Sequence, residues 1–417
     1  MFSFLDIRIG FFLALRQIRR ASFWTTSLIV FVMILTFLNL VVVSGVLVGL
    51  VQAAIDGQRA KSTGDVIIST LKDKNYIENS SEVISIINSL PEVDFFTARY
   101  RLGGTLEANY KTKKENEKPN IANGFFVGID PQAEDAVTHI SKDIIEGEYL
   151  SPTDYDQVVV GSFLIKRYLN VNAPGLTALD NVYVGTKIRL KLNGVEREVT
   201  VKGILKSKVD EITQNVYMVD SQLRSLIGRN DGNVAAIAIK LKPGADPVAV
   251  RDALILRGVD NLAKVQTYID AQPQFLKDIV TTFAMLGNVL SSIGLVVASI
   301  TIFIVIFINA ITRRKFIGIL KGIGVSGQAI EVSYIFQSIF YAVCGSVVGF
   351  FLVYGFLVPF FISHPIDFPF SDGILVAPLD QTLLRMGLLV LATLIAGYIP
   401  ARMIVRKNTL DSILGRN

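Results

Sequence analysis

Residues 279–312 read IVTTFAMLGNVLSSIGLVVASITIFIVIFINAIT and contain no Asp, Glu, Lys or Arg. Residues 21–55 and 332–366 share this property, and a shorter apolar stretch lies between Arg385 and Arg402. A helix needs about 20 apolar residues to cross a ~30 Å hydrocarbon core, and one charge at mid-depth costs roughly 3 kcal/mol. The sequence therefore predicts a membrane protein of α-helical class with four transmembrane helices.

The composition agrees with a chain of which about a third lies in lipid. Hydrophobic residues make up 51% of the 417 residues, and the mean hydropathy is +0.48. Both values are high for a water-soluble protein. The net charge of +5 arises largely from residues that flank the apolar runs. A basic face threaded with aromatic side chains is absent from the sequence pattern, so we expect no nucleic-acid partner.

The spacing of the apolar runs predicts one helix, then a soluble domain of about 220 residues, then three helices. Cytoplasmic helix ends retain Lys and Arg. Such residues precede the first run and follow the second and fourth: Arg8, Arg16, Arg19 and Arg20; Arg313, Arg314, Lys315 and Lys321; Arg402, Arg406, Lys407 and Arg416. The loop from Pro359 to Gln381 contains three Asp and no Lys or Arg. We predict a multi-pass protein of the cell (inner) membrane, with both termini cytoplasmic and the large domain extracytoplasmic.

Two further features concern the exported domain and the start of the chain. The single cysteine, Cys344, lies in the third apolar run, so the exported domain has no disulfide and must fold through its own core. The basic start and first run are similar to a signal peptide, but this run is more than twice the usual h-region of about 7–15 residues. We expect it to be retained as an anchor. Arg385, near the outer end of the fourth span, is expected to snorkel to the headgroups.

The residues before the first span have a helical apolar period. Apolar side chains recur at spacings of three and four at Phe4, Ile7, Phe11, Leu15 and Ile18, opposite Asp6, Gln17 and Arg20. This pattern predicts an amphipathic helix that lies on the inner leaflet in contact with membrane lipid. The alternative is an extension of the first span.

The region between the first and second spans predicts a mixed α and β domain. Lys187–Leu192 alternates strictly, Asn193-Gly194 follows, and Val199 and Val201 resume the alternation, which indicates a β-hairpin. Other expected strands are Val66–Ser69, Gln157–Val160 and Ala235–Leu241. Helix starts are expected at Asn79, as a cap paired with Glu82, and at Asp246-Pro247. Two strand-helix units near 65–130 and 200–270 should flank a β-rich middle near 145–200, and residues 111–123 should form a loop.

The long apolar runs exceed what a bilayer requires. Runs of 34 or 35 residues would measure about 50 Å as helix, against ~30 Å of hydrocarbon. For the first and second spans we expect the excess to continue as a two-helix stalk between membrane and domain. The alternative is that these spans end near Leu47 and begin near Gly287, with irregular chain beyond.

Small residues at helical spacing favour close helix packing. Gly45 and Gly49 in the first span, and Gly345 and Gly349 in the third, each have the small-xxx-small spacing. Packing within one chain and packing across a dimer are both compatible with this pattern.

The connection after the second span reads RRKFIGILKGIGVS over residues 313–326. It resembles the R-x-x-E-I-G-I-L-K/R-A-x-G-A/V-S/T motif of ATP-binding-cassette permeases of the FtsX and MacB type. The order of one helix, outer domain and three helices is similar too. Further resemblances are Gln337, Gly345 and Gly349 in the third span, Pro400-Ala401-Arg402 with Thr409–Leu414, and, in the outer domain, Gly128–Pro131, Glu146–Glu148 and Val159–Gly161, which resemble the core domain of MacB and of the lipoprotein-releasing LolC/LolE permeases.

The resemblance extends over nearly the whole chain and implies a MacB-like α+β core domain inserted between the first and second transmembrane helices. The resulting divisions are 1–20, interfacial helix; 21–55, first span and stalk; 56–275, core domain; 276–312, stalk and second span; 313–330, coupling helix; 332–360, third span; 361–381, outer loop; 382–404, fourth span; and 405–417, tail.

The resemblance also implies the partners and the coupling residues. In such families a permease dimer, of identical or related chains, sits on two copies of a separate ATPase, and a short helix docks into it. The matched positions are Phe316, Ile317, Gly318, Leu320, Lys321, Gly322, Ile323 and Gly324. Phe316 replaces the family's frequent Glu, so a contact made by that carboxylate is not implied here. The alternative for this segment is a basic loop that only sets topology.

No catalytic constellation is evident in the sequence. There is no phosphate-binding G-x-x-x-x-G-K-[ST] loop and no G-x-S-x-G elbow, and His139 and His364 lack companions at metal-ligand spacing. We therefore expect a non-catalytic subunit without a cofactor or metal of its own, ATP and Mg being bound by the partner ATPase. The long spans also lack the ionisable groups of channels and proton-coupled carriers.

Two functions remain open. In the first, the chain is a permease that exports or extracts a lipoprotein, peptide or amphiphile, with an extracytoplasmic substrate protein or adaptor as a possible partner. In the second, it is an FtsX-like mechanical transmitter that regulates an extracytoplasmic enzyme without transport. The size of the outer domain favours the first. A plain membrane-anchored binding domain without an ATPase is a third possibility.

Overall fold

The computed structural model describes residues 3–113, 118–169, 177–368, 371–373 and 375–405. It divides into two compact units. One, the helical unit, comprises residues up to 51, 277–367 and those from 372 on. The other, the core domain, comprises residues 52–276 and 368–371. The predicted tail, including Arg406, Lys407, Arg416 and Thr409–Leu414, lies outside the described residues.

Among the described residues, four helical stretches are long and apolar enough to cross a membrane: Phe23–Thr63, Gln274–Thr312, Gly327–Ser363 and Leu379–Met403. The first contains α2 (Phe23–Leu38), a π-helical turn (Asn39–Val43), α3 (Ser44–Gln58) and a second π turn (Arg59–Thr63). The third contains α11 (Gly327–Leu352), a π turn (Val353–Leu357) and α12 (Val358–Ser363). The other two are α9 (Gln274–Thr312) and α13 (Leu379–Val405). The first stretch runs past residue 55 and the second begins before residue 279. The first therefore does not end near Leu47, and the second does not begin near Gly287.

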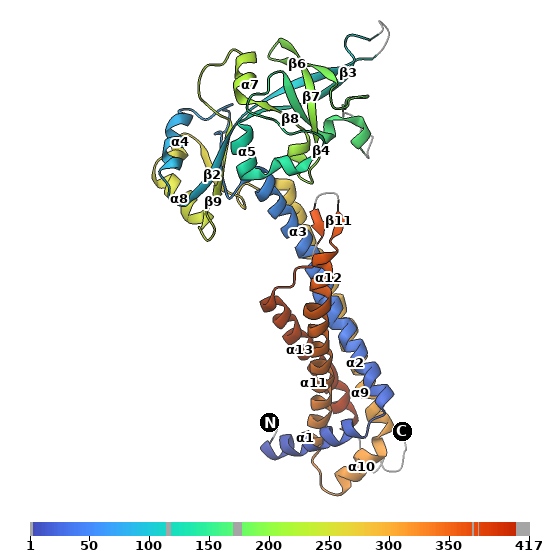
Figure 1. Cartoon of the computed structure of the whole chain (residues 1–417). Coiled ribbons are helices and arrows are strands. Elements are labelled where there is room, and N and C mark those ends of the chain that lie inside the picture. Colours follow the sequence, from blue (N-terminus) through green and yellow to red (C-terminus); the bar gives the residue numbers. More distant parts are fainter. Residues whose placement is uncertain (1–2, 114–117, 170–176, 369–370, 374, 406–417) are drawn as a thin grey trace. The chain divides into compact units, whose positions relative to one another are not determined.

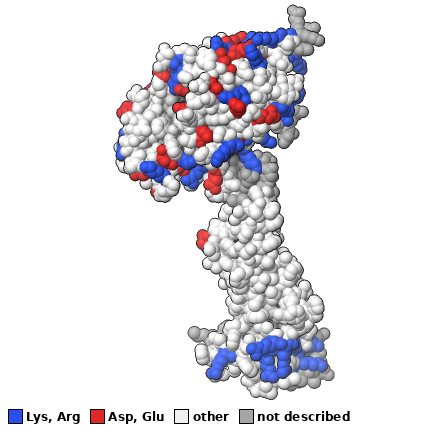
Figure 2. Space-filling model, in the orientation of Figure 1, with Lys and Arg blue, Asp and Glu red and all other residues white. Residues whose placement is uncertain are grey.

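Two short helices complete the helical unit, α1 (Phe4–Arg19) and α10 (Arg314–Gly322). Three residues, Arg20, Ala21 and Ser22, separate α1 from α2, so α1 is a helix of its own. Its small residues Gly10 and Ala14 are buried, and a Cβ on Gly10 would lie 2.8 Å from the Ala329 carbonyl oxygen of α11. Figure 2 shows Lys and Arg gathered at the end of this unit where Figure 1 places α1 and α10, below a band almost free of charge.

Glycines set the separation of the membrane helices within the chain. A Cβ added to Gly345 would lie 2.3 Å from Met33 Cβ, and one added to Gly349 would lie 2.4 Å from Phe37 Cδ1, both of α2. A Cβ added to Gly45 would likewise lie 2.8 Å from the carbonyl oxygen of Val376, and Gly49 is buried. Only a residue without a side chain lets α11 approach α2 this closely.

The core domain contains a mixed sheet of ten strands among the described residues, in the order β10-β1-β9-β2-β3-β8-β5-β7-β4, with β6 paired to β2 and β7 (Figure 1). The strands are β1 (Val66–Ser69), β2 (Val93–Ala108), β3 (Asn120–Ile129), β4 (Ile144–Gly147), β5 (Gln157–Gly161), β6 (Lys187–Leu192), β7 (Val195–Leu205), β8 (Asn215–Val219), β9 (Ala236–Leu241) and β10 (Lys264–Thr267). β11 (Ile366–Phe368) and β12 (Ser371–Gly373) form a separate pair.

The helices of the core domain pack against the sheet, and together they enclose three hydrophobic cores. They are α4 (Ser80–Asn88), α5 (Pro131–Thr138), α6 (Asp210–Thr213), α7 (Asp220–Leu226) and α8 (Pro247–Leu256), with 3₁₀ turns at Ile140–Asp143, Ser162–Leu164, Lys166–Tyr168 and Val259–Asn261. The two predicted end units adjoin in space, because β1, β9 and β10 pair and share one core with α4 and α8. The predicted β-rich middle supplies β4–β7. The fold class predicted from sequence is confirmed.

Short sequence signals predicted the local structure correctly where the residues of the turn or helix cap adopt the backbone conformation that the signal requires. Asn193-Gly194 joins β6 and β7 with positive φ at both residues, as a tight hairpin requires, and Asp246 accepts a hydrogen bond from Val248 N as predicted. Asn79 does not cap α4 through its side chain, because it adopts a left-handed backbone with φ 52° that turns the side chain away from the helix start. The predicted 111–123 loop is too long, since β3 already begins at Asn120, where it pairs with Ala108.

Two predictions follow from buried contacts of the fold, one in each unit. In the core domain, Glu134 is 1% exposed and accepts hydrogen bonds from Arg99, Thr97 and Thr138. Burial alone would lower the pKa of Arg99, but the charge and hydrogen bonds of Glu134 outweigh it and raise that pKa. Glu134→Ala should destabilise the domain by roughly 3–5 kcal/mol, because Arg99 would remain charged and unpaired.

The matched control is Glu78→Ala, which breaks the exposed pair of Lys74 and Glu78 and should cost far less stability, because solvent screens an exposed pair. Hydrogen exchange of residues 131–138 in the purified full chain, as a function of denaturant, measures both. Equal effects of the two changes would contradict the importance of the buried pair.

In the helical unit, Gly345→Ala should lower thermal stability by roughly 1–3 kcal/mol, since the new methyl group would overlap Met33 and the backbone of α2. Gly387→Ala on α13 is the control, because an added Cβ there has no heavy atom within 4 Å. Thermal unfolding of the two detergent-purified variants should show a lowered midpoint only for Gly345→Ala.

Candidate functional site

The helix α10 is the first candidate site, because it carries the predicted coupling residues. Its inward face is apolar: Ile317 and Leu320 belong to the core of the helical unit, and Gly318 is buried. Its outward face is apolar as well, with Phe316 49%, Ile319 53% and Ile323 73% exposed. These three lie at i, i+3 and i+7, so they form one stripe along the helix.

The glycines of this segment have different roles. Gly324 adopts φ +95° directly after α10, where the chain turns and Val325 N donates to the Leu320 carbonyl at 3.0 Å. This is the left-handed helix end that glycine favours. Gly322 has an ordinary backbone, is exposed, and a Cβ there would meet open space. A side chain at Gly322 would therefore be tolerated by this chain.

Contacts at both ends fix α10 and the start of α11. Lys321 Nζ donates to the carbonyl oxygen of Val405, at the end of α13. Ser326 caps α11 by accepting from Ala329 N at 3.1 Å, and its hydroxyl also donates to Asp6 of α1. The exposed stripe of α10 is thus presented by a helix held at several points.

A chain of buried and half-buried amides, which sequence reasoning did not connect, joins three helices of the same unit. Gln337 Nε2 donates to Gln17 Oε1 at 2.6 Å, and Asn309 Nδ2 donates to Gln337 Oε1 at 3.4 Å. These residues lie on α11, α1 and α9. Gln17 was assigned from its period to the polar side of α1, but it is buried, because its side faces α11 and not water.

Arg385 has a partner within the chain, because its guanidinium donates to Ser44 Oγ at 2.5 Å, in the first membrane stretch. The expected headgroup contact of Arg385 stays a prediction. Within the described residues, the two histidines are not part of any group of three metal-ligating side chains.

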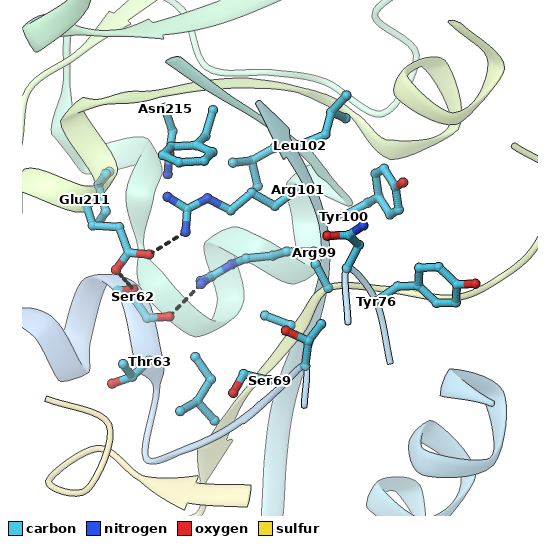
Figure 3. Close-up of a pocket in the computed structure, with 18 of the residues that line it drawn as sticks. Ser62, Thr63, Ser69, Tyr76, Arg99, Tyr100, Arg101, Leu102, Glu211 and Asn215 are labelled. Carbon is cyan, nitrogen blue, oxygen red and sulfur yellow. Dashed lines mark hydrogen bonds and ion pairs between the residues drawn. The ribbon is translucent and has the colours of Figure 1, made fainter. Parts of the chain in front are cut away.

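The second candidate site is the junction segment, residues 58–65, which ends the first helical stretch and leads into β1. Side chains of the core domain fasten it. Arg99 NH1 donates to the Ser62 carbonyl at 2.7 Å, while the same guanidinium binds Glu134. Glu211 accepts from Gln58 Nε2 at 3.2 Å. It also accepts from Ser62 Oγ at 3.3 Å (Figure 3).

Further ionic contacts complete the junction segment. Lys61 pairs with Asp143 at 2.9 Å, and Arg59 Nε donates to Asp65 at 2.6 Å. Asp65 in turn accepts from Leu241 N of β9 at 2.7 Å. A displacement of this helix end would have to break or carry along several charge-assisted contacts.

A cavity of about 760 Å³ lies beside the junction segment, inside the core domain. Figure 3 shows Arg99 and Arg101 of β2 extending toward Ser62 and Glu211, with Tyr76 and Tyr100 on the other side of the strand. Arg101 NH1 donates to Glu211 at 3.1 Å, and its guanidinium lies 3.9 Å from the centroid of the Phe125 ring. The sequence pattern did not reveal this cavity, because it forms where segments distant in the chain meet.

Comparisons with known proteins agree with this organisation. The model of the MacB-like periplasmic core domain matches residues 26–255, more than half of the chain, and that of the FtsX-like permease C-terminal region matches residues 288–409. An uncharacterized ABC transporter permease of Methanocaldococcus jannaschii is 23% identical over 340 residues, which are 80% of this chain and 78% of the relative.

Two solved structures are similar to the core domain. The periplasmic region of MacB from Actinobacillus actinomycetemcomitans has a TM-score of 0.36 and 14% identity over 52% of this chain and 94% of that structure. The extracellular domain of the noncanonic ABC-type transporter YknZ from Gram-positive bacteria has a TM-score of 0.32 and 13% identity over 48% and 97%. Through its core domain and its FtsX-like membrane region, this chain belongs to the family of ABC transporter permeases with a MacB-like periplasmic core domain.

Proposed function

We propose that this chain is the non-catalytic membrane subunit that passes ATP-driven motion of a separate ATPase to its own core domain, and so exports or extracts a peptide, lipoprotein or amphiphile. Membership of the permease family implies an ABC ATPase partner. ATP and Mg would bind to that partner.

The observation that carries the proposal is the exposed stripe of α10. Phe316, Ile319 and Ile323 are large apolar side chains at the basic end of the helical unit. Exposed apolar side chains on a fixed helix favour burial by a partner protein. The flanking Arg314, Lys315 and Lys321 suit a site at the cytoplasmic face, which the positive-inside rule favours for this end.

The junction segment supports the second half of the proposal. Movement of α3 along or about its axis would be carried into the core domain by the bonds of Arg99, Glu211 and Asp143 to residues 58–62. Transport and pure mechanical signalling both use this linkage. Copurification of a lipid or lipoprotein supports transport, and copurification of a cell-wall hydrolase supports signalling.

The coupling role predicts that Gly322→Glu and Lys321→Glu uncouple the ATPase without removing the protein from the membrane. A carboxylate at Gly322 would be buried unpaired against the partner and should weaken coupling by about 2 kcal/mol or more, roughly 30-fold. ATP hydrolysis by the reconstituted complex is the measurement, with membrane content checked by immunoblot.

Gly322→Ala is the matched control for that test, because its methyl group meets open space and should leave coupling intact. Gly322→Glu is the cleaner of the two charged variants, since Lys321 also bonds to Val405 within the chain. ATP hydrolysis at the wild-type rate in both charged variants would refute the coupling assignment.

The proposed topology predicts opposite labelling of two exposed lysines replaced by cysteine in a Cys344→Ala background. A membrane-impermeant thiol reagent added to intact cells should label Lys113→Cys in the core domain. It should label Lys315→Cys on α10 only after the membrane is opened. Labelling of Lys315→Cys and not Lys113→Cys in intact cells would invert the topology and defeat the proposed function.

A further inference from the structure

The cavity in the core domain lies along an interrupted strand edge. On one side, β2 pairs with β9 through Val93–Arg99 and with β6 through Thr105–Glu107. Between them, residues 100–104 of β2 have no paired strand on that side within the described residues. The carbonyl of Arg99 still accepts from Ala235 N there. Since main-chain groups alternate in direction, those of Arg101 and Gly103 face the gap.

The gap is open and large enough for a ligand. Residues of β2 from Tyr100 to Gly103 line the cavity, as do Ala235 and Ala236 at the start of β9 and Asn193 at the end of the β6–β7 hairpin. A Cβ built on Gly103 meets no atom within 4 Å. At ~3.3 Å per residue, five unpaired residues correspond to roughly 16 Å of strand. The volume of about 760 Å³ lies within the usual range for ligand sites.

Five basic residues line the cavity, namely Lys61, Lys74, Arg99, Arg101 and Arg229. Each forms an ion pair with a carboxylate of the core domain, and only Arg101 has its carboxylate partner, Glu211, in the cavity wall as well. Arg101 shares a hydrogen bond with Glu211, yet its buried Nε has no hydrogen-bond partner. Stacking on Phe125 holds the guanidinium in place. Such a group suits a carboxylate, which accepts two parallel hydrogen bonds from arginine.

Asn215 also lines the cavity. It is 6% exposed, its Nδ2 donates to Tyr217, and its Oδ1 is shielded from the cavity. An apolar lipid chain would offer no hydrogen-bond partner to the main chain of Arg101 and Gly103 and no anion to the guanidinium of Arg101. A peptide supplies N–H donors, carbonyl acceptors and, with an acidic side chain, a carboxylate.

We propose that this cavity binds a short extended peptide segment with a carboxylate, whose main chain pairs with Arg101 and Gly103 of β2 while the carboxylate binds the guanidinium of Arg101. Pairing with a free strand edge provides affinity, and the charged contact provides selectivity. Edge pairing and charge complementarity together favour an acidic peptide over a neutral one.

The site has a direct link to the junction segment. Glu211 bonds to Arg101 and also to Gln58 and Ser62. A ligand carboxylate that competes for Arg101 would release Glu211 toward the junction segment. A role of the peptide as transported substrate rests on the proposed function, whereas binding to the cavity does not.

The test is binding of fluorescein-labelled hexapeptides to the full-length chain in lipid nanodiscs without ATPase or ATP, followed by anisotropy. The probe is a pool with Glu fixed at the third position and the other positions randomised, acetylated and amidated. The reference is the same pool with Gln in place of Glu. The Glu pool should bind saturably and at least about tenfold more tightly, the loss expected for one charge-assisted hydrogen bond.

Two variants locate the binding. Arg101→Gln removes the charge and should weaken binding of the Glu pool about tenfold or more. Gly103→Leu projects into open space, so the domain should fold, and it should abolish binding by filling the edge. Arg197→Gln is the control, because this exposed arginine on β7 pairs with Asp156 and does not line the cavity.

A pool with a free C-terminal carboxylate and Gln at the third position distinguishes the two sources of the carboxylate. Tight binding of that pool assigns the contact with Arg101 to the chain terminus and supports the site. No saturable binding of either carboxylate pool up to about 1 mM, or equal binding by wild type, Arg101→Gln and Gly103→Leu, would overturn it. Displacement of the bound Glu pool by an equal concentration of the amidated Gln pool would also overturn the proposed site.

The result is separable from the coupling test. Gly322→Glu, which should fail in ATP coupling, should bind the Glu pool like wild type, because Gly322 lies in the helical unit and not in the cavity.

Discussion

The exclusion of charge from hydrocarbon is the constraint on which this molecule is built. Apart from the Cys344 thiol and the His364 imidazole, the polar side chains in the three runs of 34 or 35 residues without a charge are mainly amides and hydroxyls. Because a charge at mid-depth costs roughly 3 kcal/mol, ionic groups collect at the ends of the helices and in the core domain. The proposed partner contacts therefore lie on α10 and around residues 58–65, and in the proposed function α2, α3 and α9 connect them.

The parts of the fold that sequence predicted are those governed by short-range or compositional rules. The membrane helices, the Asn193-Gly194 hairpin and the Asp246 cap each depend on residues within a few positions of one another. The order of strands in the sheet was beyond such reasoning. It depends on β1 meeting β9 and β10, which are about 170 and 200 residues away in the chain. Asn79 shows the limit of the local rules as well, because its backbone conformation disables a cap that its chemistry would allow.

The two candidate sites, α10 and the junction segment, could be predicted from the sequence to different degrees. The glycine-rich segment 313–326 predicted a short helix where α10 lies, and the structure explains Gly324 by its positive φ. No sequence motif predicted the contacts of the junction segment. Arg99, Glu134 and Glu211 are ordinary charged residues in sequence. Nothing near them indicates that Glu134 becomes buried, or that Arg99 and Glu211 bond to the junction segment. Long-range ion pairs of this type are set by the tertiary fold, so a single sequence does not reveal them.

The charged contacts of the junction segment also explain why a strong linkage can remain adjustable. Arg99 is tied to Glu134, which is almost fully buried, so this bond holds the Ser62 carbonyl in a fixed place. The side chain of Glu211 is 42% exposed, and its carboxylate oxygens accept hydrogen bonds from Gln58, Ser62 and Arg101. None of these three residues is buried through its contact with Glu211 alone. Exposed pairs contribute little energy and exchange partners readily. A rigid bond beside a replaceable one lets the helix end stay attached to the domain while its contacts with the cavity wall change.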